Sequence, residues 1–195
     1  MKRFAEVERT TKETKIKAEF NIDGNGENDI STGIPFFDHM LTLFSVHGFF
    51  DLNLRASGDI DVDYHHTVED VGLVLGEALA IALGNRKGIK RYGHAVTPMD
   101  DAISTVTIDL SNRPFLVYLI PELFVRQTEV YSCLFKEFFR AFSNKSGMNL
   151  HINASYGEND HHLIESIFKS FARSLDLATS VDERVKHVHS SKGLL

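Results

Sequence analysis

Hydrophobic and polar residues alternate along two segments near the start of the chain. Residues 4–11 and 13–22 both predict β-strands, and the second has a clear two-residue period, with apolar side chains on one face. Residues 23–26, Asp-Gly-Asn-Gly, are typical of a β-hairpin turn. The pattern therefore predicts two strands followed by a hairpin turn.

The next segments mix this strand period with the longer period of amphipathic helices. Residues 35–47 predict a helix that begins at a proline and ends near Gly48. Alternation over residues 51–57 predicts a further strand. Apolar residues at helical spacing then predict a helix over residues 67–83, which ends before Gly84.

The second half of the chain repeats this order of elements. The predicted elements are strands at 102–110 and 115–120, a helix at 131–143, a strand at 150–155 and a helix at 163–177. The sequence Leu-Asn-Leu-Arg-Ala-Ser at 52–57 also aligns with Leu-His-Ile-Asn-Ala-Ser at 150–155. These matches indicate an internal duplication, with pseudo-repeats of about 1–90 and 91–180 and a polar tail at 181–195.

No low-complexity linker separates the two halves. We therefore expect one merged domain over residues 1–195, of the α/β (α+β) class. In it, duplicated strand–helix–strand–helix units would form sheets that face a layer of helices.

Composition narrows the possible functions. The chain has 195 residues, of which 43% are hydrophobic and 25% charged, as in a soluble globular protein with a sizeable core. A net charge of −6 gives no reason to expect a nucleic-acid partner. The single cysteine, Cys133, excludes an intramolecular disulfide and a cysteine-based zinc site. The start lacks the apolar stretch of a signal peptide and no window is long enough for a membrane span, so we expect a cytoplasmic protein.

A motif of two histidines and a glutamate occurs twice, as His-His-Thr-Val-Glu at 65–69 and His-His-Leu-Ile-Glu at 161–165. On a helix the first histidine and the glutamate, four residues apart, share a face, whereas the second histidine lies about 100° further round. A lone histidine is more often an ordinary core or surface residue than a ligand. Doubling the pair at two helix starts, where cations are disfavoured, instead predicts neutral, metal-bound imidazole. Nitrogen and carboxylate ligands without thiolate suit Mn, Fe, Co or Zn.

Other candidates have weaker patterns. His39 and His151 lie in matching regions of the two halves and could be ligands or ordinary residues, whereas His47 and His94 are interpreted as ordinary residues. The aspartates at 59, 61 and 63 are interpreted as a solvated strand face, and those at 100 and 101 as a turn. A weak pattern for anion binding consists of Arg91, Arg113, Lys169 and the Ser-Ser-Lys-Gly segment at 190–193.

Several segments together resemble the imidazoleglycerol-phosphate dehydratase family along nearly the whole chain. The matching segments are residues 9–14, 32–41, 65–72, 98–100, 109–114, 157–162 and 190–193. The chain departs from the common family pattern at Ile34-Pro35, at Leu43, where glutamine is common, and at Asp101, where glutamate is common. None of these positions is a proposed metal ligand.

The resemblance implies a di-manganese lyase with a ribosomal protein S5 domain 2-like fold, assembled into a 24-subunit shell with active sites between subunits. It implies that one Mn²⁺ binds His39, His65, Glu69 and His162, and that the other binds His66, His151, His161 and Glu165. It further implies Glu13 as the acid/base residue, with Asp100 as a second candidate. The substrate phosphate would bind Arg91, Arg113, Lys169, Ser191 and Lys192.

The implied reaction is dehydration of imidazole glycerol phosphate to imidazole acetol phosphate in histidine biosynthesis. No carbonyl acidifies the C–H bond that must break, so the imidazole ring itself has to supply electrons. Two metals on the ring nitrogens would stabilise imidazolate, which expels the hydroxyl through a diazafulvene intermediate. Glu13 would transfer the remaining proton.

Two alternatives use the same ligands. A dinuclear metallohydrolase acting on a phosphorylated small molecule would activate water and release phosphate. A metal-binding structural or storage protein would need the ligands but neither Glu13 nor a phosphate site.

Overall fold

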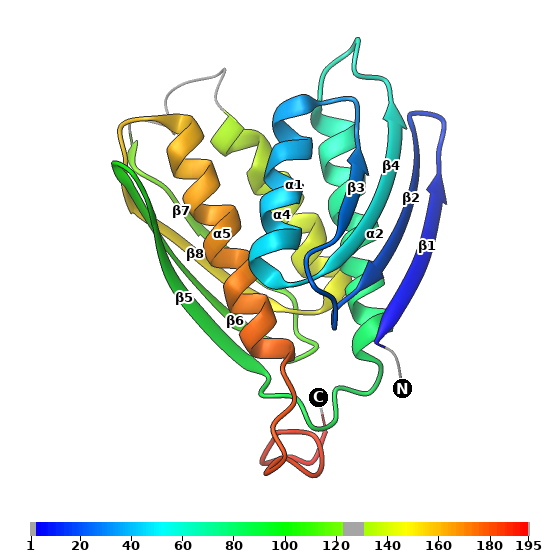
Figure 1. Ribbon diagram of the computed structural model, residues 1–195, viewed down its shortest axis with the longest axis vertical. Helices are drawn as coiled ribbons and strands as arrows, with labels where there is room; N and C mark the ends of the chain where they lie inside the picture. The colour runs from blue at the N-terminus through cyan, green and yellow to red at the C-terminus, as the bar shows by residue number, and fades with distance from the viewer. Residues whose placement is uncertain (1–2, 123–130, 195) are drawn as a thin grey trace.

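The computed structural model describes residues 3–122 and 131–194. The first half contains β1 (Phe4–Thr10), β2 (Thr14–Asn21), β3 (Asn28–Ser31), α1 (Pro35–Gly48), β4 (Asp51–Gly58) and α2 (His65–Leu83). The second contains β5 (Tyr92–Met99), β6 (Ala102–Asp109), β7 (Phe115–Leu119), α4 (Tyr131–Ser146), β8 (Asn149–Tyr156) and α5 (Asp160–Thr179). The two four-stranded sheets have the orders β1-β2-β4-β3 and β5-β6-β8-β7, which confirms the predicted duplication (Figure 1).

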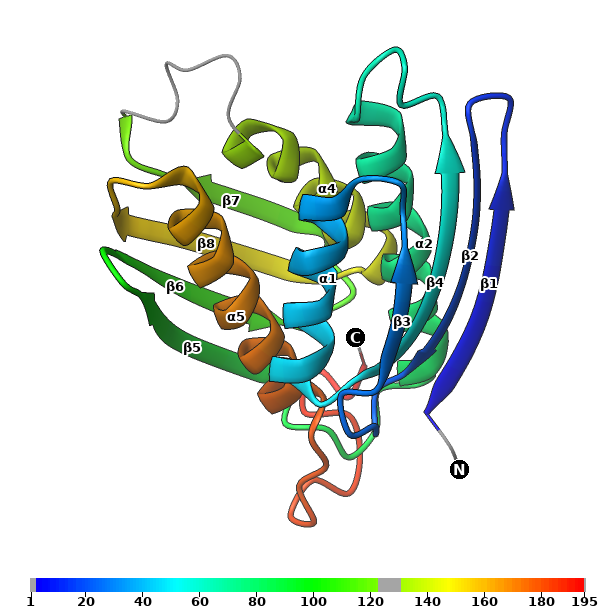
Figure 2. The same ribbon diagram turned by 45° about the horizontal axis from the view of Figure 1, so that its top comes forward.

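Helices lie between the two sheets (Figure 2). In the first half α2 packs on β1 and β2 and α1 on β3, and in the second half α5 packs on β5 and β6 and α4 on β7. The two helix layers then pack against each other, α2 on α4 and α1 on α5. This arrangement confirms the predicted α/β class, with sheets facing helices. In the described ranges no helix is both long and apolar enough to cross a bilayer.

Phenylalanine side chains join the two helix layers. Phe44 of α1 stacks on Phe171 of α5, with ring centroids 5.5 Å apart, and Phe37 meets Phe138 of α4 edge-on at 5.5 Å. All four rings are fully buried. Each such pair contributes ~0.5–1.5 kcal/mol beyond its buried area. This aromatic layer fixes α1 against α5, the two helices on which part of the site depends.

The predicted hairpin at residues 23–26 is wrong. β3 does not pair with β2, because β4 lies between them, antiparallel to β2 and parallel to β3. The Asp-Gly-Asn-Gly segment instead crosses the end of the sheet. There the Asp51 carboxylate at the start of β4 accepts hydrogen bonds from the backbone N–H groups of Asn25 and Glu27. The turn chemistry was recognised, but its partner strand comes from later in the chain.

Three further stretches differ from the sequence prediction. The strands β3 and β5 were not predicted, since β3 has only four residues and β5 contains Pro98. β5 tolerates the proline because it is an edge strand. The interpretation of Asp59, Asp61 and Asp63 as a strand face is also wrong. β4 ends at Gly58, and the chain turns there, with Val62 N–H donating to the Asp59 carbonyl at 2.8 Å.

Candidate metal and phosphate sites

The start of α5 is fixed by its own sequence. Asn159 caps the helix, and its side-chain oxygen accepts hydrogen bonds from the backbone N–H groups of His161 and His162. One turn further along the helix, Glu165 Oε2 lies 3.2 Å from His161 Nε2. The predicted sharing of a face by this histidine and glutamate is therefore confirmed.

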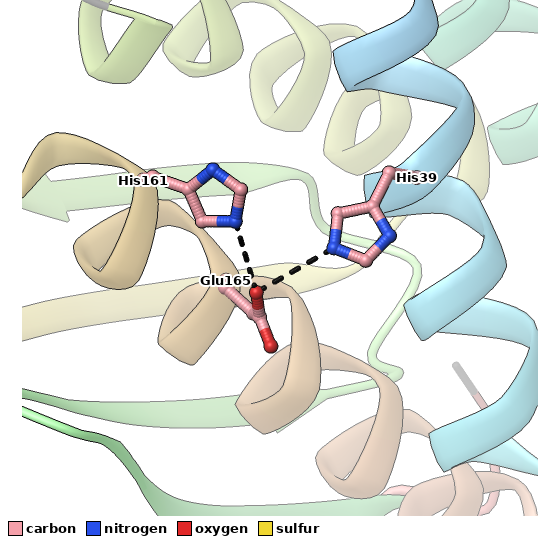
Figure 3. Close-up of side chains that lie close together, drawn as sticks. All are labelled: His39, His161 and Glu165. Atoms are coloured by element: carbon pink, nitrogen blue, oxygen red, sulfur yellow. Dashed lines mark hydrogen bonds and ion pairs between the residues drawn. The ribbon is translucent and has the colours of Figure 1, made fainter.

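α1 adds a third group to this pair. His39 Nε2 lies 3.5 Å from Glu165 Oε2, and the three side chains point toward one another (Figure 3). Their candidate ligand atoms all lie within 4.8 Å of one another, the spacing of groups that can bind one metal ion. Glu165 is nearly buried, with its side chain 8% exposed, whereas the two histidines are about half exposed. The group is thus open to solvent on its histidine side.

Lys169 belongs to the same cluster. Its Nζ lies 2.6 Å from Glu165 Oε1, the oxygen that does not face the histidines. Burial alone would raise the pKa of Glu165, but the hydrogen bond and charge of Lys169, together with His39, lower that pKa below its ordinary value. Glu165 is therefore held as a carboxylate, with one oxygen on Lys169 and the other toward His39 and His161.

The duplicated half repeats the helical pair in a more open setting. His65 Nε2 lies 3.5 Å from Glu69 Oε2 at the start of α2, and both side chains are more than two-fifths exposed. Asp63 accepts a hydrogen bond from the His65 backbone N–H, as Asn159 does on α5. The two halves therefore present equivalent histidine–glutamate pairs at equivalent helix starts.

The second histidine of each pair uses its other ring nitrogen. His66 Nδ1 lies 3.0 Å from Asp59 Oδ2, and His162 Nδ1 lies 2.5 Å from Asp101 Oδ1. These hydrogen bonds raise the pKa of both histidines, and that of His162 in turn holds the pKa of Asp101 well below its usual range. Neither aspartate can be recognised as a site residue from the sequence, because only the folded chain places each of them beside its imidazole.

The two candidate acid/base residues lie in different halves of the duplicated chain. Glu13 lies in the turn between β1 and β2, where its charge adds to that of Asp59 in raising the pKa of His66. Asp100 lies in the predicted turn, between β5 and β6, with Oδ2 3.7 Å from His162 Nε2. Each half thus places a carboxylate from a strand turn close to its second histidine.

The chain by itself brings together only part of the ligand set implied by the resemblance. His39 lies with His161 and Glu165, residues that the resemblance assigns to the other metal. His151, on an exposed position of β8, has its Nε2 2.9 Å from Asn149 Oδ1. The division of the eight ligands between two ions therefore stays a prediction.

A separate pocket, the candidate phosphate pocket, is lined by the predicted phosphate-binding residues other than Lys169. Its volume is ≈ 550 Å³, and its lining includes Arg91, Arg113, Ser191 and Lys192. Ser111 also lines it and was missed. This serine is 2% exposed, and its Oγ has no hydrogen-bond partner in the described part of the chain. An anion in the pocket would accept that hydrogen bond; the sequence signal was the position of Ser111 two residues before Arg113.

Arg91 connects this pocket to the C-terminal tail. Its Nε lies 2.6 Å from Asp109 Oδ1, and its guanidinium donates to the His189 carbonyl at 2.7 Å. Asp109 raises the pKa of Arg91, which stays charged. The tail is thereby held over the pocket, with Ser191 and Lys192 in its lining.

The pocket and the histidine pairs lie at opposite ends of the folded molecule. The backbone N–H of Arg91 donates to the carbonyl of Ala178, near the end of α5, whereas His161 lies at the start of that helix. Seventeen residues of helix separate Ala178 from His161, a distance of ~26 Å. In agreement, the helices α1, α2 and α5 begin at the top of Figure 1 and the tail lies at the bottom. Lys169 stays with the histidines and lies apart from the phosphate pocket.

Known proteins match this chain over its full length. A family model described as imidazoleglycerol-phosphate dehydratase matches residues 32–175. Proteins of that name from Desulfosudis oleivorans and Syntrophobacter fumaroxidans are 59% and 58% identical, covering 100% of this chain and 100% and 98% of their own. The chain belongs to the imidazoleglycerol-phosphate dehydratase family.

Solved structures of the dehydratase family have the same fold. The dehydratase from Staphylococcus aureus superposes with a TM-score of 0.80 at 34% identity, covering 92% of this chain and 99% of its own. The one from Pyrococcus furiosus gives 0.81 at 35% identity, covering 97% and 100%. The family model spans both histidine pairs, His39 and Arg113, whereas Glu13 and the tail fall within the full-length relatives.

Proposed function

We propose that this chain is a metal-dependent hydro-lyase that converts imidazole glycerol phosphate to imidazole acetol phosphate and water in histidine biosynthesis. Membership of the dehydratase family supports the reaction. The observation that supports metal dependence best is the group of His39, His161 and Glu165, whose ligand atoms lie within 4.8 Å. A cytoplasmic location is part of the same proposal, since the substrate is a soluble metabolite.

The donors present fit a divalent ion of the Mn²⁺ type. They are imidazole nitrogens and carboxylate oxygens, and Glu165 is kept ionised by Lys169. Two ions would be held by eight residues: His39, His65, His66, Glu69, His151, His161, His162 and Glu165. When bound, such ions act as Lewis acids that favour the imidazolate form of the substrate ring.

The remaining chemistry belongs to the chain's own side chains. Glu13, close enough to His66 to affect its pKa, would move the proton of the reacting carbon, with Asp100 as the second acid/base candidate. Ser191, Lys192 and Arg113 would bind the phosphate, with Arg91 holding the tail over it. The phosphate contacts supply position, which keeps the reacting carbon beside the carboxylate.

Lys169 has a different setting from the other predicted phosphate ligands. It is paired with Glu165, next to the histidines. We propose that Lys169 fixes Glu165 within one chain. Any contact of Lys169 with phosphate would then occur where the histidine end of one copy meets the phosphate pocket of a second copy.

The separation of the two ends supports shared active sites. A small substrate cannot span ~26 Å between His161 and Arg91 of one chain. We propose that copies of the chain assemble, as a 24-subunit shell, so that the histidine end of one meets the phosphate pocket of another. Residues 1–195 would act as one domain of two pseudo-repeats, with a tail at 181–195 that completes the phosphate site.

The test is an assay of the purified, Mn²⁺-loaded protein with imidazole glycerol phosphate. We expect an enolisable ketone that retains its phosphate. Release of inorganic phosphate without ketone would favour a dinuclear metallohydrolase and contradict the proposal.

A further inference from the structure

Two aspartates contact the second histidine of each pair in the same way. The Asp59 carboxylate lies 3.0 and 3.2 Å from His66 Nδ1, and Asp101 Oδ1 lies 2.5 Å from His162 Nδ1. In contrast, the first histidines, His65 and His161, turn Nε2 toward their glutamates. Within each pair, therefore, one ring meets a glutamate on its own helix and the other meets an aspartate from a loop.

The duplication does not by itself explain these contacts. Asp59 follows β4, in the loop that leads into α2, whereas Asp101 lies in the turn between β5 and β6. The first-half counterpart of that turn joins β1 to β2, because the two sheets have the same strand order. The same hydrogen bond to Nδ1 is thus built from two non-equivalent positions. A contact obtained independently in the two halves indicates a requirement of the site.

Both aspartates are themselves fixed by the backbone. Asp101 Oδ2 accepts hydrogen bonds from the N–H groups of Glu158 and Asn159 at 2.5 and 3.1 Å, which leaves Oδ1 for the histidine. The Asp59 N–H donates to the Glu13 carbonyl at 3.1 Å, and the Asp59 carbonyl accepts from Val62. Asp101 is therefore anchored at its carboxylate, and Asp59 is anchored at its main chain.

A hydrogen bond at Nδ1 decides which nitrogen of an imidazole can bind a metal. A carboxylate acceptor keeps the proton on Nδ1 and leaves the Nε2 lone pair available, and it also orients the ring. We propose that Asp59 and Asp101 are positioning residues that hold His66 and His162 with Nε2 directed to the metal ions. This inference rests on the proposed metal site and deepens it.

The test measures Mn²⁺ affinity of the assembled full-length protein at fixed pH, counting free ion by electron paramagnetic resonance. We expect Asp59→Ala and Asp101→Ala to weaken Mn²⁺ binding by ~10–100-fold each, the usual effect of removing such a partner. Asp61→Ala and Glu158→Ala are the matched controls. Asp61 lies in the same loop as Asp59, and Glu158 lies in the loop between β8 and α5 whose backbone contacts Asp101, so each control removes the same charge close to the aspartate it matches. Neither control side chain makes a hydrogen bond or ion pair within residues 3–122 and 131–194.

Asparagine variants separate positioning from folding. Asp59→Asn and Asp101→Asn keep an oxygen that can accept from Nδ1, so we expect them to lose less affinity than the alanine variants. They also provide the measurement if an alanine variant does not assemble. Mn²⁺ affinities of all the aspartate variants equal to those of the controls would overturn the positioning roles alone. A wild-type protein that binds no Mn²⁺ would overturn the metal site itself, and the positioning roles with it.

Discussion

At the scale of single residues, each half of the chain places a histidine beside a glutamate on its own helix and a second histidine beside an aspartate from a loop. The histidine–glutamate pairs were predictable because their spacing of four residues lies within one helix. The contact between His39 and Glu165 was not, since it depends on the packing of α1 on α5. Asp59 was assigned to a strand and Asp101 to a turn, and only the folded chain shows the imidazoles beside them.

Glu13→Gln tests the proposed acid/base residue. Glutamine is nearly isosteric but cannot accept or release a proton, so we expect kcat to fall by ~10²–10⁴-fold. Bound metal should stay the same, because Glu13 is not a proposed ligand. Glu8→Gln, the same change at an exposed position of β1, serves as the control. Turnover of Glu13→Gln close to that of the control would remove Glu13 from this role.

Asp176 gives a prediction on pH and stability away from the site. Burial raises its pKa above the ordinary 3.8, although Lys90, Arg173 and Arg3 oppose this. The folded state therefore favours the protonated acid, and this contribution to stability is lost as pH rises through the raised pKa. Asp176→Asn should raise the urea midpoint at pH 7 at fixed protein concentration. The gain should shrink toward pH 4; an equal gain at both values would contradict the assigned cause.

At the scale of elements, the strong periods were predictable and the non-local pairings were not. Helices α1, α2 and α5 follow from apolar spacing and from end signals such as Pro35 and Gly84. β3 and β5 were missed because each is an edge strand stabilised by a partner distant in sequence or weakened by Pro98. The hairpin prediction failed for the same reason, since β4 displaces β3 from β2.

The α2–α4 contact depends on two glycines one turn apart. A Cβ on Gly72 would lie 2.6 Å from the Phe138 carbonyl oxygen, and one on Gly76 2.6 Å from that of Phe142. Alanine at either position would force the helices apart. We expect Gly72→Ala to lower the free energy of unfolding by ~1–3 kcal/mol, despite the better helix propensity of alanine. Denaturant titration checks this, and an unchanged or raised stability would contradict the close approach.

At the scale of the whole molecule, the proposed metal ligands and the proposed phosphate ligands lie far apart within one chain. The phosphate pocket lies beside the end of α5 and the histidines beside its start. Apolar side chains such as Phe115, Leu119 and Val96 are more than half exposed, which fits association with further copies. The resemblance alone implied shared sites, and the separation of the two groups of residues within one chain supports that proposal.

Mixed assemblies test whether sites are shared. His161→Ala removes a proposed metal ligand, and Arg113→Ala removes a proposed phosphate contact. Each variant alone should be nearly inactive. Dissociated and reassembled together in equal amounts, they should regain roughly a quarter of wild-type activity, because a site built from two chains combines intact ends by chance. No recovery on mixing, with normal assembly, would indicate that both ends act within one chain.

The most direct measurement of the central claim is the number of Mn²⁺ ions per chain in the assembled, metal-loaded protein, determined by elemental analysis for wild type and His161→Ala. We predict two ions per chain for wild type, bound by the twin histidine–glutamate motifs, and fewer for the variant. A wild-type ratio near zero, or an equal ratio in the two proteins, would contradict it.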